Sequence, residues 1–379
     1  MLIVANGVST AARAMIFLAV PWHVLQTTGS PVRAGLAVAA ELAGMAASSL
    51  LCAPILPRWG YRATVAGSGL VAAASIAAIP LWNLTFWPLL LAVLVHGIAR
   101  APEQTAMTVI APDLPGPADV EPDQAGRIDE YVRSGALAVG SVLAGVLIEA
   151  YQAPTTMMVG AVAIAAAAVL VGGIVRHDPV ELPVPVPYSL GLRSSLVMPV
   201  AGPGSSVLAI AAGAGLAVET AALNGVVLPV YAHDVLHSPL ALGLIAGLFA
   251  AGIVVGSALH EFVHPVQSPR FALLLVFVNV SRLCVLALRP GLPVILVWTS
   301  VAGAAVGPTM ETPTIVRYAQ VSPPFRALLD GGTRGKLFAA APVGAVLAGL
   351  AVVGIGLTAT LWVIAGLMFV LITIPALAV

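Results

Sequence analysis

The chain has 379 residues, of which 60% are hydrophobic and 8% are charged, and its formal net charge is zero. Soluble domains contain about 45–50% apolar and about 25% charged residues, so this chain has too few polar side chains to cover a water-soluble fold. The composition excludes a soluble enzyme and a secreted disulfide scaffold, and the charge balance excludes a basic face for nucleic acid. The sequence therefore predicts an all-α polytopic membrane protein.

Twelve apolar stretches are long enough to cross a bilayer, which takes about 20 helical residues. In chain order they cover residues 4–26, 34–56, 63–82, 86–110, 130–150, 155–175, 205–231, 240–261, 271–289, 292–318, 335–354 and 357–379. The connections are short, except for a proline-rich stretch at 176–204 that is typical of an extended linker. We therefore expect an N-terminal six-helix half at 1–176, a cytoplasmic linker at 177–204 and a C-terminal six-helix half at 205–379.

Basic residues gather on one side of the predicted helices, and cytoplasmic loops of membrane proteins carry an excess of Lys and Arg. With the N-terminus inside, the cytoplasmic connections contain Arg58, Arg62, Arg127, Arg176, Arg193, Arg270, Arg326, Arg334 and Lys336. The outer connections contain only Arg33 and Arg289. This distribution predicts a protein of the inner or plasma membrane of the cell with both termini in the cytoplasm.

The two predicted halves repeat each other. A shift of 208 residues aligns Pro31 with Pro239 and Gly35 with Gly243. A shift of 204 residues places the segment GSVLAG (140–145) over GAVLAG (344–349). Twelve helices in two parallel six-helix repeats are typical of secondary transporters.

Three segments resemble the major facilitator superfamily, and more narrowly its macrolide, multidrug and siderophore exporters. They are LAVPWHVLQTTGSPVRAGL (18–36), VVLPVYAHDVLHSPLALGL (226–244) and TRGKLFAAAPVGAVLAG (333–349). The resemblance implies the major facilitator fold, with two pseudo-symmetric six-helix bundles whose first, fourth, seventh and tenth helices line a central cavity. It also implies a carrier that works by alternating access. We expect a monomer in the lipid bilayer that takes a small-molecule substrate, with a proton or another ion as a coupling partner, and that needs neither a cofactor nor nucleic acid.

Two motifs of the family are present in altered form. Arg58, Gly60 and Arg62 match the family's gating loop between helices 2 and 3, although Pro57 stands where an acidic residue is usual. The antiporter motif of helix 5 keeps small residues without its proline, so the resemblance implies proton antiport only in part. The glycines that we expect to let helices pack closely are Gly140, Gly145, Gly344 and Gly349.

Ionisable residues inside the predicted spans are the candidates for substrate or ion coupling. A charge at the bilayer centre costs about 2.5–3.5 kcal/mol on insertion scales, so such a residue needs a partner, a wet cavity or a function. The candidates are Arg13, Glu41, His96, Arg100, Glu103, Glu219 and Glu311. All except Glu41 lie on the four helices that the resemblance assigns to the cavity.

The fourth helix carries three of these candidates on one face. His96, Arg100 and Glu103 are spaced i, i+4 and i+7. Two interpretations stay open: a static salt bridge between Arg100 and Glu103, or a coupling site in which Arg100 releases Glu103 to a proton or a cationic substrate. Glu219 is a second candidate for protonation, or else a carboxyl that is hydrogen-bonded between helices.

Two further arginines lie within the predicted helices. Arg13 is placed to meet Glu41 of the second helix or an anionic substrate. Arg282 lies on a helix that the resemblance assigns to the periphery, and we expect its long side chain to extend toward the outer surface.

The polar content of the helices narrows the expected substrate. The chain contains only four Asn and six Gln, whereas sugar carriers need dense amide hydrogen bonding. This favours a lipophilic or amphipathic compound, such as a drug, a siderophore or a secondary metabolite, and it favours efflux over uptake.

One motif favours a different class of protein. His260, Glu261 and His264 match the zinc metalloprotease pattern His-Glu-x-x-His, which makes an intramembrane protease the alternative. Pro265 follows the motif at once, and no histidine lies beyond it to complete a zinc site. We therefore expect no enzyme activity and no metal. A non-transporting membrane receptor or scaffold is a third alternative.

Overall fold

The computed structural model describes residues 2–110, 122–174, 217–263, 269–319 and 339–377, and the chain in these ranges is helical without any strand. The N-terminal set of helices is α1 (Leu2–Thr28), α2 (Pro31–Trp59), α3 (Tyr61–Leu81), α4 (Phe86–Ile110) and α5 (Pro122–Ile174). The C-terminal set contains the helical residues 217–222, η2 (Leu223–Val227), α8 (Leu228–Tyr231), η3 (Ala232–Leu236), α9 (Pro239–Val263), α10 (Pro269–Leu288), α11 (Leu292–Ala319), α13 (Ala341–Ile355) and α14 (Leu357–Leu377).

The predicted helix count is confirmed for the part of the chain that is described. α5 consists of two helices, because Gln152 interrupts it with φ 69° and ψ 161°. Residues 217–236 form one continuous helical segment. With α5 divided at Gln152 and 217–236 taken as one segment, the described ranges contain twelve helices. The predicted linker at 177–204 lies outside the described residues, so the division into halves stays a prediction.

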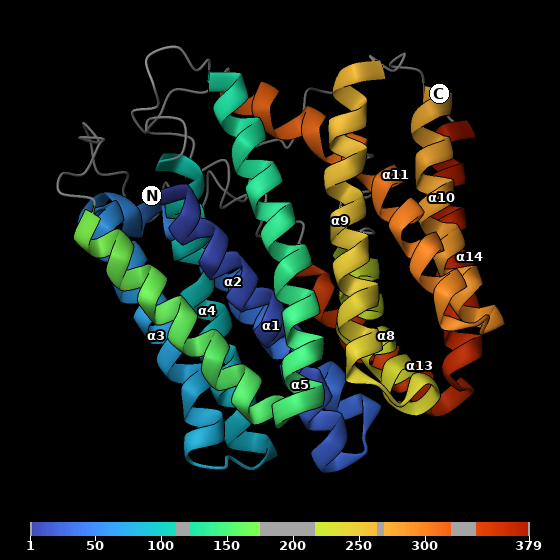
Figure 1. Cartoon of the computed structure of the whole chain (residues 1–379), viewed down its shortest axis with the longest axis horizontal. Helices are drawn as coiled ribbons and strands as arrows, with labels where there is room; N and C mark the ends of the chain where they lie inside the picture. The colour runs from blue at the N-terminus through green and yellow to red at the C-terminus, as the bar shows by residue number, and fades with distance from the viewer. Residues whose placement is uncertain (1, 111–121, 175–216, 264–268, 320–338, 378–379) are drawn as a thin grey trace.

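Tight turns join successive helices at one end of the molecule, which we call the turn end. Six of these turns contain a residue with positive φ, namely Gly29 (φ 62°), Asn83 (φ 46°), Gln152 (φ 69°), His237 (φ 49°), Arg289 (φ 51°) and Gly356 (φ 84°). Glycine adopts this conformation without a steric penalty. α1 begins and α14 ends at the opposite end, which we call the terminal end (Figure 1).

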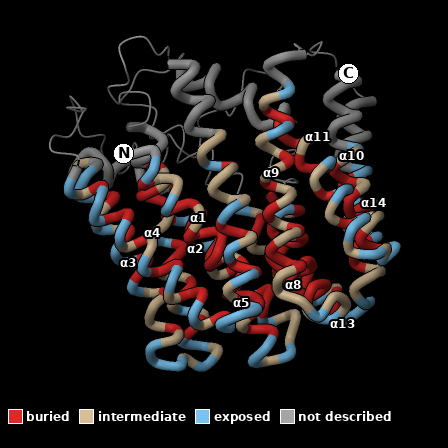
Figure 2. The backbone as a smooth tube through the Cα atoms, viewed as in Figure 1, coloured by how far each residue is buried: buried red, intermediate tan, exposed pale blue. Residues whose placement is uncertain are grey.

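The outer surface of the helices is apolar, as a bilayer requires. In the described residues, four helices are long and apolar enough to cross a membrane, namely Val4–Thr28, Arg62–Leu81, Tyr131–Gly173 and Pro239–Leu259. Large apolar side chains such as Trp87, Val169 and Leu367 are exposed on the outside. Buried residues occupy the facing sides of the helices (Figure 2).

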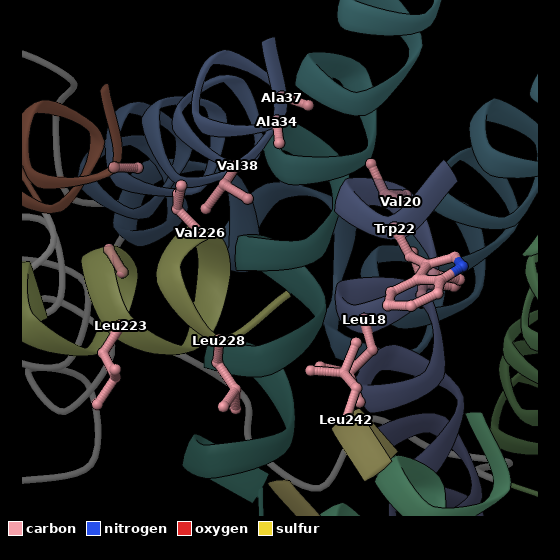
Figure 3. Packing of buried hydrophobic residues seen from close by; sticks show 14 of the residues in the cluster. Leu18, Val20, Trp22, Ala34, Ala37, Val38, Leu223, Val226, Leu228 and Leu242 are labelled. Atoms are coloured by element: carbon pink, nitrogen blue, oxygen red, sulfur yellow. The ribbon is translucent and has the colours of Figure 1, made fainter. Parts of the chain in front are cut away.

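The two sets contact each other through apolar side chains. Leu18 of α1 and Leu242 of α9 point toward one another, and Val38 of α2 lies beside Val226 of η2 (Figure 3). α5 also packs against α9, and α2 packs against α13. The core therefore runs across the boundary between the N-terminal and C-terminal sets.

Candidate functional site

Four charged side chains form two ion pairs inside the N-terminal set. The guanidinium of Arg13 on α1 pairs with Oε1 of Glu103 on α4. The hydroxyl of Ser9 donates to the same carboxylate oxygen over 2.9 Å. Nη1 of Arg100 on α4 donates to Oε1 of Glu41 on α2 over 2.6 Å. We call Arg13, Glu41, Arg100 and Glu103 the charge quartet.

The partners within the quartet differ from those that we expected. The sequence favoured Arg100 with Glu103 and Arg13 with Glu41, whereas each arginine pairs with the other carboxylate. The reason is the crossing of α2 and α4, which is closest at Gly97. A Cβ atom at Gly97 would collide with the backbone carbonyl of Glu41. This close approach brings the Glu41 carboxylate beside the next turn of α4, where Arg100 lies.

The quartet is unevenly buried and incompletely hydrogen-bonded. The Arg13, Glu41 and Glu103 side chains are 3–6% exposed, whereas Arg100 is 18% exposed. Oε2 of Glu103 is buried and has no hydrogen-bond partner among the described residues. This oxygen faces Gly69 of α3, and a Cβ built there would lie 3.6 Å from it. A buried acceptor without a partner is costly, so this oxygen is the incompletely satisfied atom of the Glu103 carboxylate.

His96 borders the quartet on α4. Its Nδ1 lies 3.1 Å from the backbone carbonyl oxygen of Ala72 on α3, which requires Nδ1 to carry the hydrogen. Its Nε2 is buried without a hydrogen-bond partner among the described residues. His96 is therefore held to α3 through Nδ1 alone among the described residues.

The C-terminal set contains a third buried ion pair. Nη2 of Arg282 on α10 donates to Oε1 of Glu219 over 3.2 Å, and both side chains are 3% exposed. The Arg282 guanidinium also lies over the ring of Phe249 on α9, with its carbon 4.1 Å from the ring centroid. Such a cation–π contact is strongest where water is excluded. Our expectation that Arg282 extends to the outer surface was wrong, because this carboxylate and this ring hold it between helices.

The helix that carries Glu219 is irregular just beyond it. η2 and η3 are π-helical turns on either side of α8, and the second ends at the left-handed His237. Single π-helical turns are rare and often lie at functional sites. Sequence reasoning missed them, and the Asn224-Gly225 pair followed by Pro229 was the only local signal.

Four glycines form a close contact between the two sets at the turn end, which we call the glycine interface: Gly35, Gly145, Gly243 and Gly349. A Cβ at Gly145 would lie 2.8 Å from the carbonyl oxygen of Pro239, and one at Gly349 would lie 2.7 Å from that of Pro31. The 204-residue shift relates Gly145 to Gly349, and the 208-residue shift relates Pro239 to Pro31 and Gly243 to Gly35. α5 thus meets α9 in the same way that α13 meets α2.

The other predicted glycines pack within a set. Gly140 approaches the backbone of Ala11 on α1, and Gly344 approaches Val218. In the predicted gating loop, Gly60 joins α2 to α3 with φ 74°, and Arg62 is exposed on the first turn of α3.

Several predicted residues fall outside the part that is described. Glu311 lies on α11, and His260 and Glu261 lie in the last turn of α9, but their side chains are not among those described. The same holds for the side chain of Arg58 on α2, and His264 lies outside the described residues.

Family comparisons decide the class of protein. Residues 2–328 match the family described as the Major Facilitator Superfamily. The chain belongs to this family. Its members are carriers, so the chain is a transporter embedded in a membrane by many helices, and the metalloprotease alternative is set aside.

Curated relatives are similar over almost the whole chain. A "Multidrug efflux pump Tap" of Mycolicibacterium fortuitum is 26% identical over 367 residues, which is 92% of this chain and 88% of that protein. A pump of the same name from Mycobacterium tuberculosis is 26% identical over 377 residues, with 95% and 88% covered.

Solved structures of carriers share the fold. The nucleoside transporter NupG matches with a TM-score of 0.73 at 11% identity, over 98% of this chain and 96% of that one. The human organic anion transporter MFSD10 matches with a TM-score of 0.68 at 15% identity, over 98% and 97%. At these identities the likeness concerns the fold, and the predicted fold class is confirmed.

Proposed function

We propose that the protein exports a small lipophilic or amphipathic compound by alternating access and exchanges it for protons at Glu103 and Glu219. The observation that carries this proposal is the state of these two carboxylates. Each is 3% exposed and each is balanced by a single arginine from another helix. A proton on either carboxylate would remove the charge that holds that arginine, which links protonation to helix contacts.

The direction of transport and the substrate class follow from the relatives and from the polar content of the helices. The relatives' names concern multidrug efflux, and the helices contain few amides for binding sugars. If both termini are cytoplasmic, the glycine interface closes the outer end, and the described arrangement is the one that receives a substrate from the cell. We infer a multi-pass protein of the cell membrane that works as a monomer.

Separate replacement of Glu103 and Glu219 tests the coupling of transport to protons. We expect Glu103→Gln and Glu219→Gln to abolish transport driven by a pH gradient in proteoliposomes, because glutamine cannot exchange a proton. The assay follows accumulation of tetraphenylphosphonium and the internal pH together. Asp234→Asn is the matched control, since this carboxylate is exposed and pairs with the adjacent His233. Full pH-driven transport by both glutamine variants would eliminate the proposed coupling.

A further inference from the structure

The quartet allows two sets of partners with the same four side chains. The observed set joins Arg13 to Glu103 and Arg100 to Glu41. In the other set, Arg100 would pair with Glu103, its i+3 neighbour on the same helix, and Arg13 would pair with Glu41. Arg13 is already within electrostatic range of Glu41 and of Arg100. An exchange of partners therefore involves only the four side chains of the quartet.

Protonation of Glu103 would weaken its ion pair with Arg13. A neutral Glu103 no longer balances Arg13, which is buried and cannot lose its own proton. The Glu41 carboxylate is the remaining anion within range of Arg13. Glu41 currently holds Arg100, so Arg13 and Arg100 would compete for it. Arg100 is the more exposed of the two arginines and is the one that solvent can compensate.

We propose that the quartet works as a partner-exchange relay, in which a proton on Glu103 transfers Arg13 to Glu41 and releases Arg100. This inference rests on the proposed function, because it assumes that Glu103 is a proton site. The proton comes from water and binds to the Glu103 carboxylate, and the net charge of the quartet rises from zero to one. Arg100 is then a positioning residue that carries the effect of a buried proton to the exposed side of the quartet.

In the relay, binding of a proton disfavours binding of a cationic substrate, as antiport of the two requires. An unpaired guanidinium at Arg100 repels a cationic compound, so the proton and a cationic substrate would not occupy the protein together. Loss of the proton returns Arg13 to Glu103 and Arg100 to Glu41, and the repulsion ends. The compound that best fits this relay is a lipophilic cation.

Other groups that can titrate near the quartet are few. The described residues of the helices packed around it that carry such groups are His23, Arg33, Arg62, His96, Tyr131, Arg133, Glu149 and Tyr151. Of these, His96 interacts electrostatically with Glu41, Arg100 and Arg13. Next to Oε2 of Glu103, α3 presents Gly69, and the second helix of α5 presents Ala168 beside Gly69, so neither helix places a titratable group from its described residues there. His96 is therefore included as a variant below.

Arginine substitutions in a Glu103→Gln background test the relay without a substrate. Glutamine keeps Glu103 permanently neutral, so Arg13 should pair with Glu41 and Arg100 should be unpaired. We expect Arg13→Gln to lower the melting temperature strongly in this background, and Arg100→Gln to lower it much less than in the wild type. A static quartet predicts the opposite order, with Arg100→Gln as damaging as in the wild type and Arg13→Gln harmless. That opposite order would overturn the relay.

A second readout does not depend on the stability of the arginine variants. Phenylglyoxal modification of Arg100, measured by peptide mapping, should be several-fold faster in Glu103→Gln than in the wild type at the same pH. Arg33→Gln is the matched control in the melting experiments, because Arg33 is exposed and lies over Phe86. The increase should persist in a His96→Gln, Glu103→Gln double variant. An unchanged modification rate would overturn the relay, while the transport assay above separately decides the proposed proton coupling.

Discussion

Arg282→Met should destabilise the protein more than any other single removal of charge in the C-terminal set. The substitution leaves Glu219 as a buried carboxylate without its counter-charge, and breaking one side of a buried pair typically costs about 3–5 kcal/mol. It also removes the guanidinium from the ring of Phe249. The free energy of unfolding in mixed detergent micelles measures the effect. The loss should be smaller at acidic than at alkaline pH, because a protonated Glu219 needs no counter-charge.

The double variant Arg282→Met, Glu219→Leu separates the ion pair from packing. Replacing a whole buried pair by apolar side chains is often neutral, so most of the stability should return. Arg289→Met is the control, because Arg289 donates to Thr358 in an exposed contact and pairs with no carboxylate among the described residues, so its loss should change stability by no more than about 0.5 kcal/mol. A double variant as unstable as the single one would show that the pair is not the cause.

The helices and the buried charges could be predicted from composition and spacing. Long apolar stretches can only satisfy their backbone in a bilayer as helices, so their number follows from the sequence. Even the break inside α5 was expected between residues 150 and 155, where Gln152 lies with positive φ. The same counting identified Arg13, Glu41 and Glu219 as ionisable residues within the spans.

The partners of those charges could not be predicted, because they depend on how helices cross. Gly44 and Gly97 let α2 and α4 approach closely, and this approach decides that Arg100 reaches Glu41. Spacing along one helix contains no such information. Arg282 shows the same limit, since its partner Glu219 is 63 residues away in sequence and on another helix.

The buried ion pairs stabilise each set of helices internally, whereas the glycine interface joins the two sets. The three buried ion pairs, Arg13–Glu103, Arg100–Glu41 and Arg282–Glu219, each lie within one set. At the turn end the sets meet mainly through small residues and apolar side chains, with one exposed hydrogen bond of 3.4 Å from the backbone N–H of Leu240 to Oε2 of Glu149. Rocking one set against the other would therefore leave the buried ion pairs intact. It would separate surfaces that make few polar contacts with each other.

Gly349→Leu should force the turn end apart. A Cβ at this position would lie 2.7 Å from the carbonyl oxygen of Pro31 and 3.0 Å from the Cα of Val32, and backbone atoms cannot move aside as side chains can. Overpacking of this kind costs about 1–3 kcal/mol, enough to reverse a balance between two states of similar energy. We expect the variant to favour an arrangement in which α2 and α13 are separated, and to lose transport.

Spin labels at Tyr151 and Val294 measure the separation, because both side chains are exposed at the turn end of opposite sets. Their distance distribution should move to longer values in Gly349→Leu and in its repeat-related counterpart Gly145→Leu. Gly354→Leu is a matched control five residues along α13, since a Cβ there has no neighbour within 4 Å. Unchanged distances in both interface variants would contradict the prediction that close contact at Gly145 and Gly349 keeps the turn end closed.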